Sequence, residues 1–528
     1  MKILSYKPGH DGHIALVENF KLTYSYEAEK DSNYRYSSLE ASNIIENLMN
    51  IPFKPDIISI SGWTNGLSTA GRPIGAGYWG IEKPKLQESN FLGQSILYCS
   101  SSHERSHILC SYALSPFPQG EPCYALVWEG HIGCFYEIDS DLEIKKLKTV
   151  MVDPGIRYSF AYALADPTFN LPEGMIRIGD AGKVMALAAF FNSNTEKFTE
   201  EEIIVSKRIL DNPFQPQKLN KKDFVNYKIF NSGPTSDECK RLCRLVSESI
   251  LNHCINEIKP LIKEKRPLLI SGGCGLNCEW NSHLKRSELF SDVFVPPCTN
   301  DTGVAIGSAA DAQFISTGNA KLNWSVYCGQ DFIDDLKLLE SNIPSVLVRT
   351  QKTLTDIALD ISNGSVYAWA NGRCEIGPRA LGNRSLLASP LLKSNLDRLN
   401  RIKQRENYRP IAPICLAEDY SSHFSEGTPN PFMLYFSKVQ SNNLPAITHV
   451  DGSARPQTVT LEQNPLIYTL LKEFKKITNN GVLCNTSLNF NGKGFINRSS
   501  DLVSYVTQNN IDGFVLNGIL FLPNKEER

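Results

Sequence analysis

Short apolar segments of strand length alternate along this chain with longer segments that have helical periodicity. The strand-like segments are residues 2–6, 13–18, 56–60, 123–128, 267–270 and 365–369, and helical patterns cover 38–49, 235–264 and 303–314. This alternation is typical of α/β proteins, in which helices cover the faces of a sheet. Because domains hold about 150 residues on average, a chain of 528 residues is expected to contain more than one such unit.

The character of the sequence changes between residues 320 and 350. Before this stretch lies a helix of small residues, then a polar and less regular segment follows, and a new strand-like unit begins at residue 365. The segment beyond it is dense in Arg, Asn and Gly. We therefore predict two units, residues 1–340 and residues 341–528.

Composition and cysteine usage exclude several classes of protein. Hydrophobic residues make up 41% of the chain and the net charge is −2, which excludes a disordered chain and gives no support for a nucleic-acid partner. A polar GHDG interrupts the N-terminus before a signal peptide can form, and apolar runs such as 184–191 are too short to span a membrane. We expect a cytoplasmic protein with no membrane partner, whose 14 cysteines are thiols and include no CxxC pair.

Three separate features carry residue types that bind metals. His103 and His107 are four residues apart, so on a helix their imidazoles share one face, although such a pair is often incidental. Glu129 ends a predicted strand, where it is either a metal ligand or a solvated carboxylate. Asp301 precedes the helix of small residues, where it either caps the helix or ligates a metal.

Two glycine-containing segments indicate phosphate binding. The SGGCGLN segment follows a predicted buried strand, and its residues Gly272, Gly273, Gly275 and Asn277 would let backbone amides approach a ligand, although a structural turn is the alternative. No Gly-Lys-Ser/Thr follows, so it is not a Walker loop. Lys183 in GDAGKVMALAA either holds a phosphate or belongs to a capped core helix.

The last third of the chain contains many basic residues interspersed with Gly, Pro and apolar residues. We interpret this density as an anion-binding pocket rather than a solvated face, because guanidinium groups bind phosphate and carboxylate in a bidentate manner. The candidate residues are Arg373, Glu375, Arg379, Arg384, Arg401, Lys403, Arg405, Arg409, His449, Arg455, Asn485, Thr486, Ser487, Asn489 and Lys493.

Five motifs together resemble one enzyme family. They are GRCEIGPRALGNRSLLASP, SGGCGLN, NDTGVAIGSAA, SARPQTV and CNTSLN, in that family's order and rough spacing. The sequence thus resembles the carbamoyltransferases that include nodulation protein U and the antibiotic O-carbamoyltransferases. The resemblance implies an N-terminal unit with the ASKHA fold of actin and sugar kinases, and a C-terminal YrdC-like α/β unit.

The resemblance also implies a reaction in two stages. Carbamoyl phosphate and ATP, with Mg²⁺, would give carbamoyl adenylate in the YrdC-like unit. The ASKHA-like unit would then transfer the carbamoyl group to a hydroxyl of a small molecule such as a natural product, sugar or nucleoside. A closed cavity between the units would limit loss of these short-lived compounds to water. The resemblance leaves the acceptor open and keeps a homodimer as an option.

Site residues carry over from the resemblance position by position. The metal ligands would be His103, His107, Asp301 and Glu129, which stands where relatives have Asp, and the metal would be iron. The catalytic candidates are His10, as general base to the acceptor hydroxyl, with Lys403 and Arg455 at the phosphates; for His10 a turn-stabilising role is the alternative. The remaining substrate and nucleotide contacts would come from Asp11, Glu129, Lys183, Gly272, Gly273, Gly275, Asn277, Arg373, Arg379, Arg384, Arg409, Asn485, Thr486 and Ser487.

Three departures from the family pattern point to a divergent acceptor or a different metal. The chain has HERSH where relatives tend to have HHLAH, it has Glu129 in place of Asp, and it has YSYEAEKDSNYRY where relatives are rich in Glu-Glu-Arg. A hydrogenase-maturation role would require paired CxxC motifs, which the chain lacks. The other alternative is a nucleotide-binding regulatory protein or kinase-like ATPase on the same fold. Such an ATPase would produce ADP, whereas carbamoylation would produce AMP and pyrophosphate.

Overall fold

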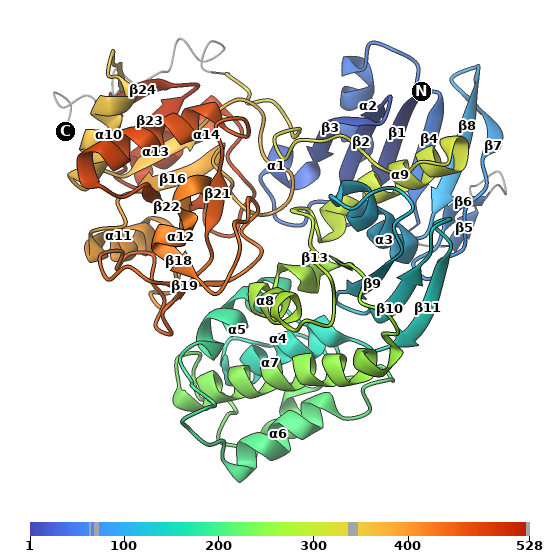
Figure 1. The fold of residues 1–528 in the computed structure, drawn as a ribbon, viewed down its shortest axis with the longest axis horizontal. Helices are drawn as coiled ribbons and strands as arrows, with labels where there is room; N and C mark the ends of the chain where they lie inside the picture. The colour runs from blue at the N-terminus through green and yellow to red at the C-terminus, as the bar shows by residue number, and fades with distance from the viewer. Residues whose placement is uncertain (63–64, 68–72, 336–346, 524–528) are drawn as a thin grey trace.

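The computed structural model describes residues 1–62, 65–67, 73–335 and 347–523. The predicted unit boundary at residue 340 lies outside the described residues. Figure 1 shows a blue N-terminal sheet, a teal sheet with a green helical lobe beneath it, and an orange-red C-terminal unit beside both.

The first sheet has strand order β3-β2-β1-β4-β8-β7. Its first three strands form an antiparallel meander, and β4 and β8 then run parallel to β1. The bounds are β1 Lys2–Lys7, β2 His13–Glu18, β3 Lys21–Glu27, β4 Ile57–Ser61, β7 Gln87–Phe91 and β8 Gln94–Ser101. Smaller elements attached to this sheet are α1 Ala28–Ser32, α2 Ala41–Asn50, β5 Asn65–Leu67 and β6 Pro73–Ala76.

The second sheet repeats the topology of the first. Its order is β11-β10-β9-β12-β13, again an antiparallel meander of three strands followed by two strands parallel to the first of them. The bounds are β9 Cys123–Trp128, β10 Gly133–Ile138, β11 Ile144–Thr149, β12 Leu268–Ser271 and β13 Val293–Phe294. This duplication is the arrangement expected of an actin-like or sugar-kinase-like unit, so the predicted N-terminal fold is confirmed.

Two helices lie between the duplicated sheets. Helix α3 (His103–Leu114) packs on β9 and β12, and α9 (Val304–Thr317) packs on β1, β2 and β4. The two helices also pack closely on each other, because a Cβ added at Gly307 would lie 1.8 Å from the carbonyl oxygen of Ser106. The small residues of α9 therefore allow an approach that brings the N-terminal ends of both helices together.

A helical lobe is inserted between β11 and β12. It consists of α4 Pro154–Ala165, α5 Ala181–Ala188, α6 Glu200–Leu210 and α7 Asp237–Ile258, and α8 Cys278–Arg286 follows β12. The helix predicted over 235–264 ends at Ile258 and continues only as a 3-10 turn, since Pro260 has no N–H to donate. Among the described residues, no helix combines the length and apolar character that crossing a membrane requires.

The C-terminal unit is built on an eight-stranded mixed sheet with apolar cores on both faces. Helices α10 Leu354–Ser362 and α13 Pro465–Thr478 pack in one core, and α11 Lys393–Ile402 and α14 Ser499–Gln508 in the other. The strand order is β14-β24-β23-β15-β16-β22-β17-β21. The bounds are β14 Leu347–Arg349, β15 Tyr367–Ala370, β16 Arg384–Ala388, β17 Ala412–Leu416, β21 Gln457–Val459, β22 Val482–Ser487, β23 Gly513–Leu516 and β24 Ile519–Pro523, with α12 Tyr420–His423 and a small sheet of β18 Phe424–Ser425, β19 Ser437–Val439 and β20 Ser453–Ala454 beside it.

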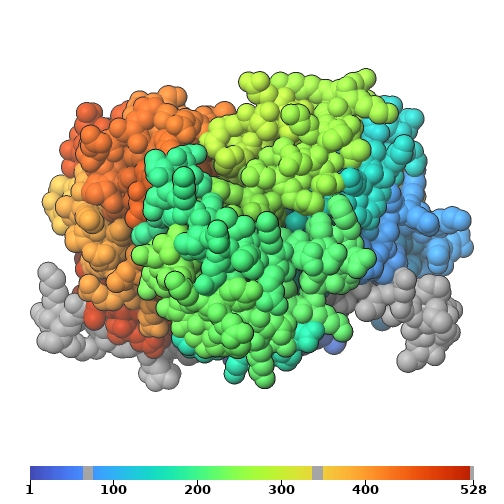
Figure 2. Space-filling model, turned by 90° about the horizontal axis from the view of Figure 1, so that it is seen from below, coloured from blue at the N-terminus to red at the C-terminus, as the bar shows by residue number. Residues whose placement is uncertain are grey.

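Buried charges join the C-terminal unit to the first sheet. Lys30 on α1 is 3% exposed; its ammonium pairs with Glu27 at 2.8 Å and donates to the carbonyls of Glu375 and Gly377. Figure 2 shows the helical lobe, in green, lying against the orange C-terminal unit. There the amide of Asn281 donates to the carbonyl of Leu434 at 3.0 Å. The C-terminal unit therefore contacts both halves of the N-terminal one.

All 14 cysteines are free thiols in the structure, as the sequence predicts. Two pairs of cysteines have CxxxC spacing, Cys239 with Cys243 and Cys274 with Cys278. The first pair lies on α7 with its sulfurs 3.9 Å apart, and the second runs from the 3-10 turn before α8 to the first residue of α8. Both side chains of the first pair are buried in the core of the helical lobe, where they act as small apolar residues.

Candidate metal centre and cationic pocket

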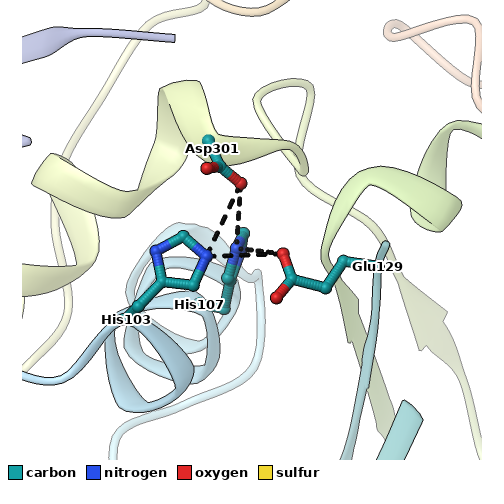
Figure 3. A group of neighbouring side chains, drawn as sticks. All are labelled: His103, His107, Glu129 and Asp301. Carbon is teal, nitrogen blue, oxygen red and sulfur yellow. Dashed lines mark hydrogen bonds and ion pairs between the residues drawn. The ribbon is translucent and has the colours of Figure 1, made fainter. Parts of the chain in front are cut away.

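Four buried side chains converge between the two N-terminal sheets, as Figure 3 shows: His103, His107, Glu129 and Asp301. One ligand atom from each lies within 4.8 Å of the others. Glu129 Oε2 lies 3.4 Å from His103 Nε2 and 3.2 Å from His107 Nε2, and Asp301 Oδ1 lies 3.7 and 3.4 Å from the same two nitrogens. The structure thus brings together the four residues that the sequence analysis proposed as ligands.

Each of the four residues is positioned by the end of a secondary-structure element. Ser102 caps α3 by accepting from the amide of Arg105, so both histidines lie on the first turns of this helix. Glu129 directly follows β9, and Asp301 begins the 3-10 turn that leads into α9. Because α3 and α9 are in contact and β9 lies beside α3, the three ends meet at one point.

Two residues that the sequence analysis missed contact the carboxylates from outside the cluster. Lys7, at the end of β1, is fully buried, and its Nζ lies 3.0 Å from Asp301 Oδ2. The hydroxyl of Tyr78 donates to Glu129 Oε1, and the Tyr78 ring stacks on His103 with centroids 4.5 Å apart. A lysine two residues before the GHDG turn was a signal for the first; the sequence holds no comparable signal for Tyr78.

The electrostatics of the cluster follow from burial of opposite charges. Burial lowers the pKa of His107, but Glu129 and Asp301 outweigh burial and raise this pKa to about 10. Burial raises the pKa of both carboxyls, yet the histidines hold the pKa of Glu129 below its ordinary value, and Lys7 and His103 do the same for Asp301. The cluster therefore has high affinity for positive charge, whether that charge is a proton or a metal ion.

This donor set fits a metal ion. His107 Nε2 is buried and, among the described residues, makes no hydrogen bond of ordinary geometry, although a carboxylate oxygen lies 3.2 Å away. Two imidazole nitrogens with two carboxylate oxygens suit manganese, iron, cobalt or zinc, so the donor set does not select iron. His10, Asp11 and Asp301 form a second group of ligand type. The Lys7 ammonium lies against its Asp301 oxygen and disfavours a second cation there.

The charged residues between the two histidines have a structural explanation. Arg105 is 2% exposed and forms a bidentate pair with Asp311 of α9, at 2.7 and 2.9 Å. Glu104 is buried as well, accepting from the Tyr136 hydroxyl and, at 2.6 Å, from the amide of Gly80. The HERSH sequence thus fixes α3 in place and keeps both histidines directed at the cluster.

His10 lies beside the metal cluster on the GHDG turn. Its Nε2 is 3.6 Å from Asp301 Oδ2, and its Nδ1 is 3.0 Å from Asp11 Oδ2. The His10 side chain is 42% exposed, whereas the ligand side chains are buried, so it borders the space from which an acceptor would approach. Asp11 has a φ of 52° and is buried, which gives it a structural part in the turn.

The SGGCGLN segment forms a 3-10 turn between β12 and α8. Gly272 has a φ of 93°, and a Cβ there would lie 2.4 Å from the carbonyl of Trp128; a Cβ at Gly275 would lie 2.4 Å from Thr299 Oγ1. Both glycines are thus required by close packing. A Cβ at Gly273 meets nothing within 4 Å, so its backbone borders open space.

Asn277 and Lys183 have protein partners in the structure. Asn277 Oδ1 caps α8 by accepting from the backbone amides of Glu279 and Trp280. This is a structural role, the alternative to ligand binding that the sequence analysis gave for this segment. Lys183 lies on α5, pairs with Asp180 at 3.0 Å and reaches Glu406 of the C-terminal unit at 3.5 Å. Lys183 therefore faces the C-terminal unit, and its role in phosphate binding stays a prediction.

Basic side chains gather in the C-terminal unit where it faces SGGCGLN. Burial, followed by the neighbouring Arg455, lowers the pKa of Arg379 to about 9, and burial with Arg409 and Arg455 lowers that of Arg405 to about 9. The Nε atoms of Arg379 and Arg455 are buried without a hydrogen-bond partner among the described residues. Uncompensated positive charge with unused donors is the electrostatic condition for binding a phosphate.

Arg379 connects these basic side chains to the SGGCGLN segment. Its Nη2 donates to the carbonyl of Leu276, in the SGGCGLN segment, at 2.9 Å. The backbone of Gly182 at the start of α5 also lies against Arg409, since a Cβ added there would be 3.5 Å from Arg409 Nη2. The cationic pocket, defined by Arg379, Lys403, Arg405, Arg409 and Arg455, thus borders the N-terminal unit.

Lys403 holds a turn of the same pocket. Its Nζ donates to the carbonyl oxygens of Ser487 and Asn489, at 2.7 and 2.9 Å, and to Asn489 Oδ1, so its three donors have protein partners. Asn485 donates to Ala380 and Gln457, while its Oδ1 is buried without a partner among the described residues. Lys403 therefore orders the end of β22, where Thr486 is also buried.

Two predicted anion-binding residues are corrected by the structure. Arg384 is fully buried, and its five N–H groups all donate within the protein, to Asn371, Gly372, Asn383 and twice to Asn497. Arg373 donates to the carbonyls of Thr23, Cys328 and Gly329 and so joins the C-terminal unit to β3. Both guanidinium groups hold backbone carbonyls together, because a buried fork of five donors satisfies several carbonyls at once.

A cavity of about 600 Å³ lies away from both sites, between the helical lobe and the small sheet of β18, β19 and β20. Its charged lining includes Arg244, Glu279 and Lys438, and no side chain of the metal cluster or of the cationic pocket borders it. Arg244 pairs with Glu279, so part of this lining charge is already neutralised.

Comparison with known proteins identifies relatives over nearly the whole chain. Residues 94–310 match the family described as Carbamoyltransferase N-terminus, and residues 358–522 match Carbamoyltransferase C-terminus. A 3'-hydroxymethylcephem-O-carbamoyltransferase from Amycolatopsis lactamdurans is 44% identical, with 98% of each chain covered. Nodulation protein U from Sinorhizobium fredii is 31% identical, covering 94% of this chain and 95% of that protein. A ROK family glucokinase structure from Streptomyces griseus aligns over 58% of this chain and 98% of that one, with 10% identity and a TM-score of 0.27.

Proposed function

The chain belongs to the carbamoyltransferase family, and on that premise we propose that it is an ATP-dependent O-carbamoyltransferase. The observation that carries the proposal is the pairing of two unlike sites in one chain: a buried cluster of metal-ligand type in the N-terminal unit and a cationic pocket with unused arginine donors in the C-terminal unit, whose Arg379 donates to Leu276 of the SGGCGLN segment. A protein that only binds or hydrolyses a nucleotide has no need of both.

The donor half-reaction is proposed for the C-terminal unit, which we take as residues 341–528. Water cleaves carbamoyl phosphate to carbamate and inorganic phosphate, and a carbamate oxygen attacks the α-phosphorus of ATP, releasing pyrophosphate and forming carbamoyl adenylate. The unused Nε donors of Arg379 and Arg455 support anion binding in this pocket. Lys403 orders the turn at Ser487 and Asn489 through its three donors, so we assign it a positioning role.

The transfer half-reaction is proposed for the N-terminal unit, residues 1–340. His103, His107, Glu129 and Asp301 would hold one metal ion, which supplies Lewis-acid stabilisation of the oxygens of the adenylate. The open backbone at Gly273 would face its phosphate. The acceptor hydroxyl attacks the carbamoyl carbon, the bond to AMP breaks, and His10 takes the hydroxyl proton at Nε2 while Asp11 contacts Nδ1.

For the acceptor, we propose a hydroxymethyl group on a small anionic molecule of the cephem type. Two relatives that are 44% and 43% identical over 98% of this chain are named for 3'-hydroxymethylcephem. Identity to nodulation protein U is 31%. Because acceptor contacts diverge fastest within such families, the greater similarity to the cephem enzymes favours their class of acceptor.

The test begins with the donor half-reaction and requires no acceptor. Purified protein is incubated with ATP, Mg²⁺ and carbamoyl phosphate, and the products are identified by mass spectrometry and a pyrophosphate assay. Pyrophosphate release that depends on carbamoyl phosphate supports the proposal. Production of ADP supports the kinase-like alternative instead. Adding a 3'-hydroxymethylcephem then tests the acceptor, because transfer adds one carbamoyl group to its mass; a protein that makes adenylate but leaves the cephem unchanged refutes only the acceptor.

A further inference from the structure

Each carboxylate of the metal cluster directs one oxygen at the histidines, and its other oxygen contacts a polar group outside the cluster. In Glu129, Oε2 faces both Nε2 atoms while Oε1 accepts from the Tyr78 hydroxyl. In Asp301, Oδ1 faces the same nitrogens while Oδ2 lies 3.0 Å from Lys7 Nζ. The two donors come from different parts of the first half of the chain, yet they divide the two carboxylates in the same way.

We propose that Lys7 and Tyr78 are positioning residues that keep Asp301 and Glu129 monodentate and so leave coordination positions open for substrate oxygens. The inference rests on the proposed function in taking the cluster as a metal site. Two imidazoles and two monodentate carboxylates supply four ligand atoms, which leaves two positions on an octahedral ion. If both carboxylates chelated, the protein would fill all six positions.

Lys7 differs from a neutral group that contacts a metal ligand because it carries a positive charge. Its ammonium is fully buried, and it also donates to the carbonyl of His10, which ties the GHDG turn to Asp301. A fixed positive charge beside a metal ligand weakens the binding of any cation. The presence of the Lys7 charge beside Asp301 is therefore consistent with a role in directing Asp301 rather than in strengthening metal binding.

Tyr78 performs the same task without a charge. Its ring stacks on His103 with an interplanar angle of 15°, and its hydroxyl donates to Glu129. The two residues therefore form a matched pair for experiment. Removing the Tyr78 hydroxyl removes a hydrogen bond to Glu129 and no formal charge, whereas replacing Lys7 removes the positive charge beside Asp301 and the hydrogen bond to the His10 carbonyl.

The experiment loads the full-length protein with Mn²⁺ and measures water-proton relaxation, which reports the number of exchangeable waters on the ion. Wild type, Lys7→Met and Tyr78→Phe are compared at saturating Mn²⁺, with Lys240→Met on helix α7 of the helical lobe as control. We expect the relaxation enhancement to fall by about half in each variant, as one of about two waters is displaced by chelation. Mn²⁺ should bind at least about tenfold more tightly to Lys7→Met and within about threefold of wild type to Tyr78→Phe.

Unchanged relaxation in both variants, or weaker Mn²⁺ binding to Lys7→Met, would overturn the inference while leaving the proposed reaction intact. Wild-type protein that binds no Mn²⁺, Co²⁺ or Zn²⁺ would overturn the metal site itself and this inference with it. If Lys7→Met does not fold, Tyr78→Phe decides the question, and Lys7→Arg should restore the wild-type relaxation because it keeps a charged donor.

Discussion

The buried pair of Arg105 and Asp311 offers the most direct test of how the metal cluster is held. Asp311 is fully buried and accepts three hydrogen bonds, two from Arg105 at 2.7 and 2.9 Å and one from Ser101 at 2.7 Å. Asp311→Leu would leave a guanidinium buried without its counter-charge. Removing one partner of such a pair costs about 3–5 kcal/mol, and the reverse change Arg105→Met should cost a similar amount.

The double variant should be much more stable than the summed costs of the two single variants predict. Arg105→Met with Asp311→Leu removes both charges, and what remains unpaired is the hydroxyl of Ser101 and the carbonyl of Ile81 that Arg105 contacts at 2.8 Å. An unpaired neutral group of this kind costs about 1–3 kcal/mol, so the two groups together should cost roughly 2–6 kcal/mol. The two changes should therefore be coupled by about 3 kcal/mol or more, with the sign of mutual compensation.

Calorimetry of thermal unfolding and hydrogen exchange of the α3 amides would measure these effects. Each single variant should lower Tm by roughly 5–15 °C and speed exchange in α3. The double variant should lower Tm by clearly less than the two single shifts combined. The surface pair Lys240 and Asp237, 2.9 Å apart, supplies a matched control whose loss should leave Tm nearly unchanged. Single variants that each cost under 1 kcal/mol, or costs that simply add in the double variant, would refute the reasoning.

Three further predictions test the two sites. His107→Ala should remove the bound metal, measured by elemental analysis, and stop transfer, while pyrophosphate release that depends on carbamoyl phosphate continues; loss of both activities would contradict the division between units. Gly273→Ala should leave Tm unchanged but raise KM for the nucleotide at least several-fold, whereas Gly275→Ala should lower Tm because its Cβ meets Thr299 at 2.4 Å; equal Tm values would contradict this. The pKa of His107 is raised to about 10, so a metal ion must displace its proton at neutral pH. Below pH 10, metal affinity should therefore increase up to about tenfold for each unit by which the pH is raised. Titration in weak buffer should detect proton release on metal addition.

The sequence predicted the parts of the molecule that depend on local pattern. Strand and helix positions followed from periodicity. The helix predicted over 235–264 was too long at its C-terminal end, since the α-helix stops at Ile258, before Pro260. The four candidate metal ligands that the structure brings together were also named from the sequence, because a histidine pair at helical spacing is a local signal and the family motifs supplied the two carboxylates. Their convergence, however, depends on the packing of α3 against α9, which no single motif contains.

The sequence could not show which basic residues face the pocket. Arg384 and Arg379 lie in the same motif, yet Arg384 binds Asn497, 113 residues further along the chain, whereas Arg379 has a buried Nε with no partner among the described residues. What separates them is the set of backbone carbonyls around each guanidinium, and this is fixed only when β16 pairs with β22. Lys7 was missed for a related reason, since its partner Asp301 comes from the far end of the N-terminal unit.

The contact of Lys30 with the C-terminal unit also sets an order for synthesis. Lys30 and Glu27 leave the ribosome early, but the carbonyl of Glu375 that Lys30 binds is 345 residues further along the chain. At translation rates of about 5–20 residues per second, roughly 15–70 s pass before that partner emerges. During this interval the end of the first hairpin remains hydrated and its charges stay in water. All strands of the first sheet precede residue 102 and can pair during this interval, but the buried contact of Lys30 with the C-terminal unit forms only after residue 377 has been made.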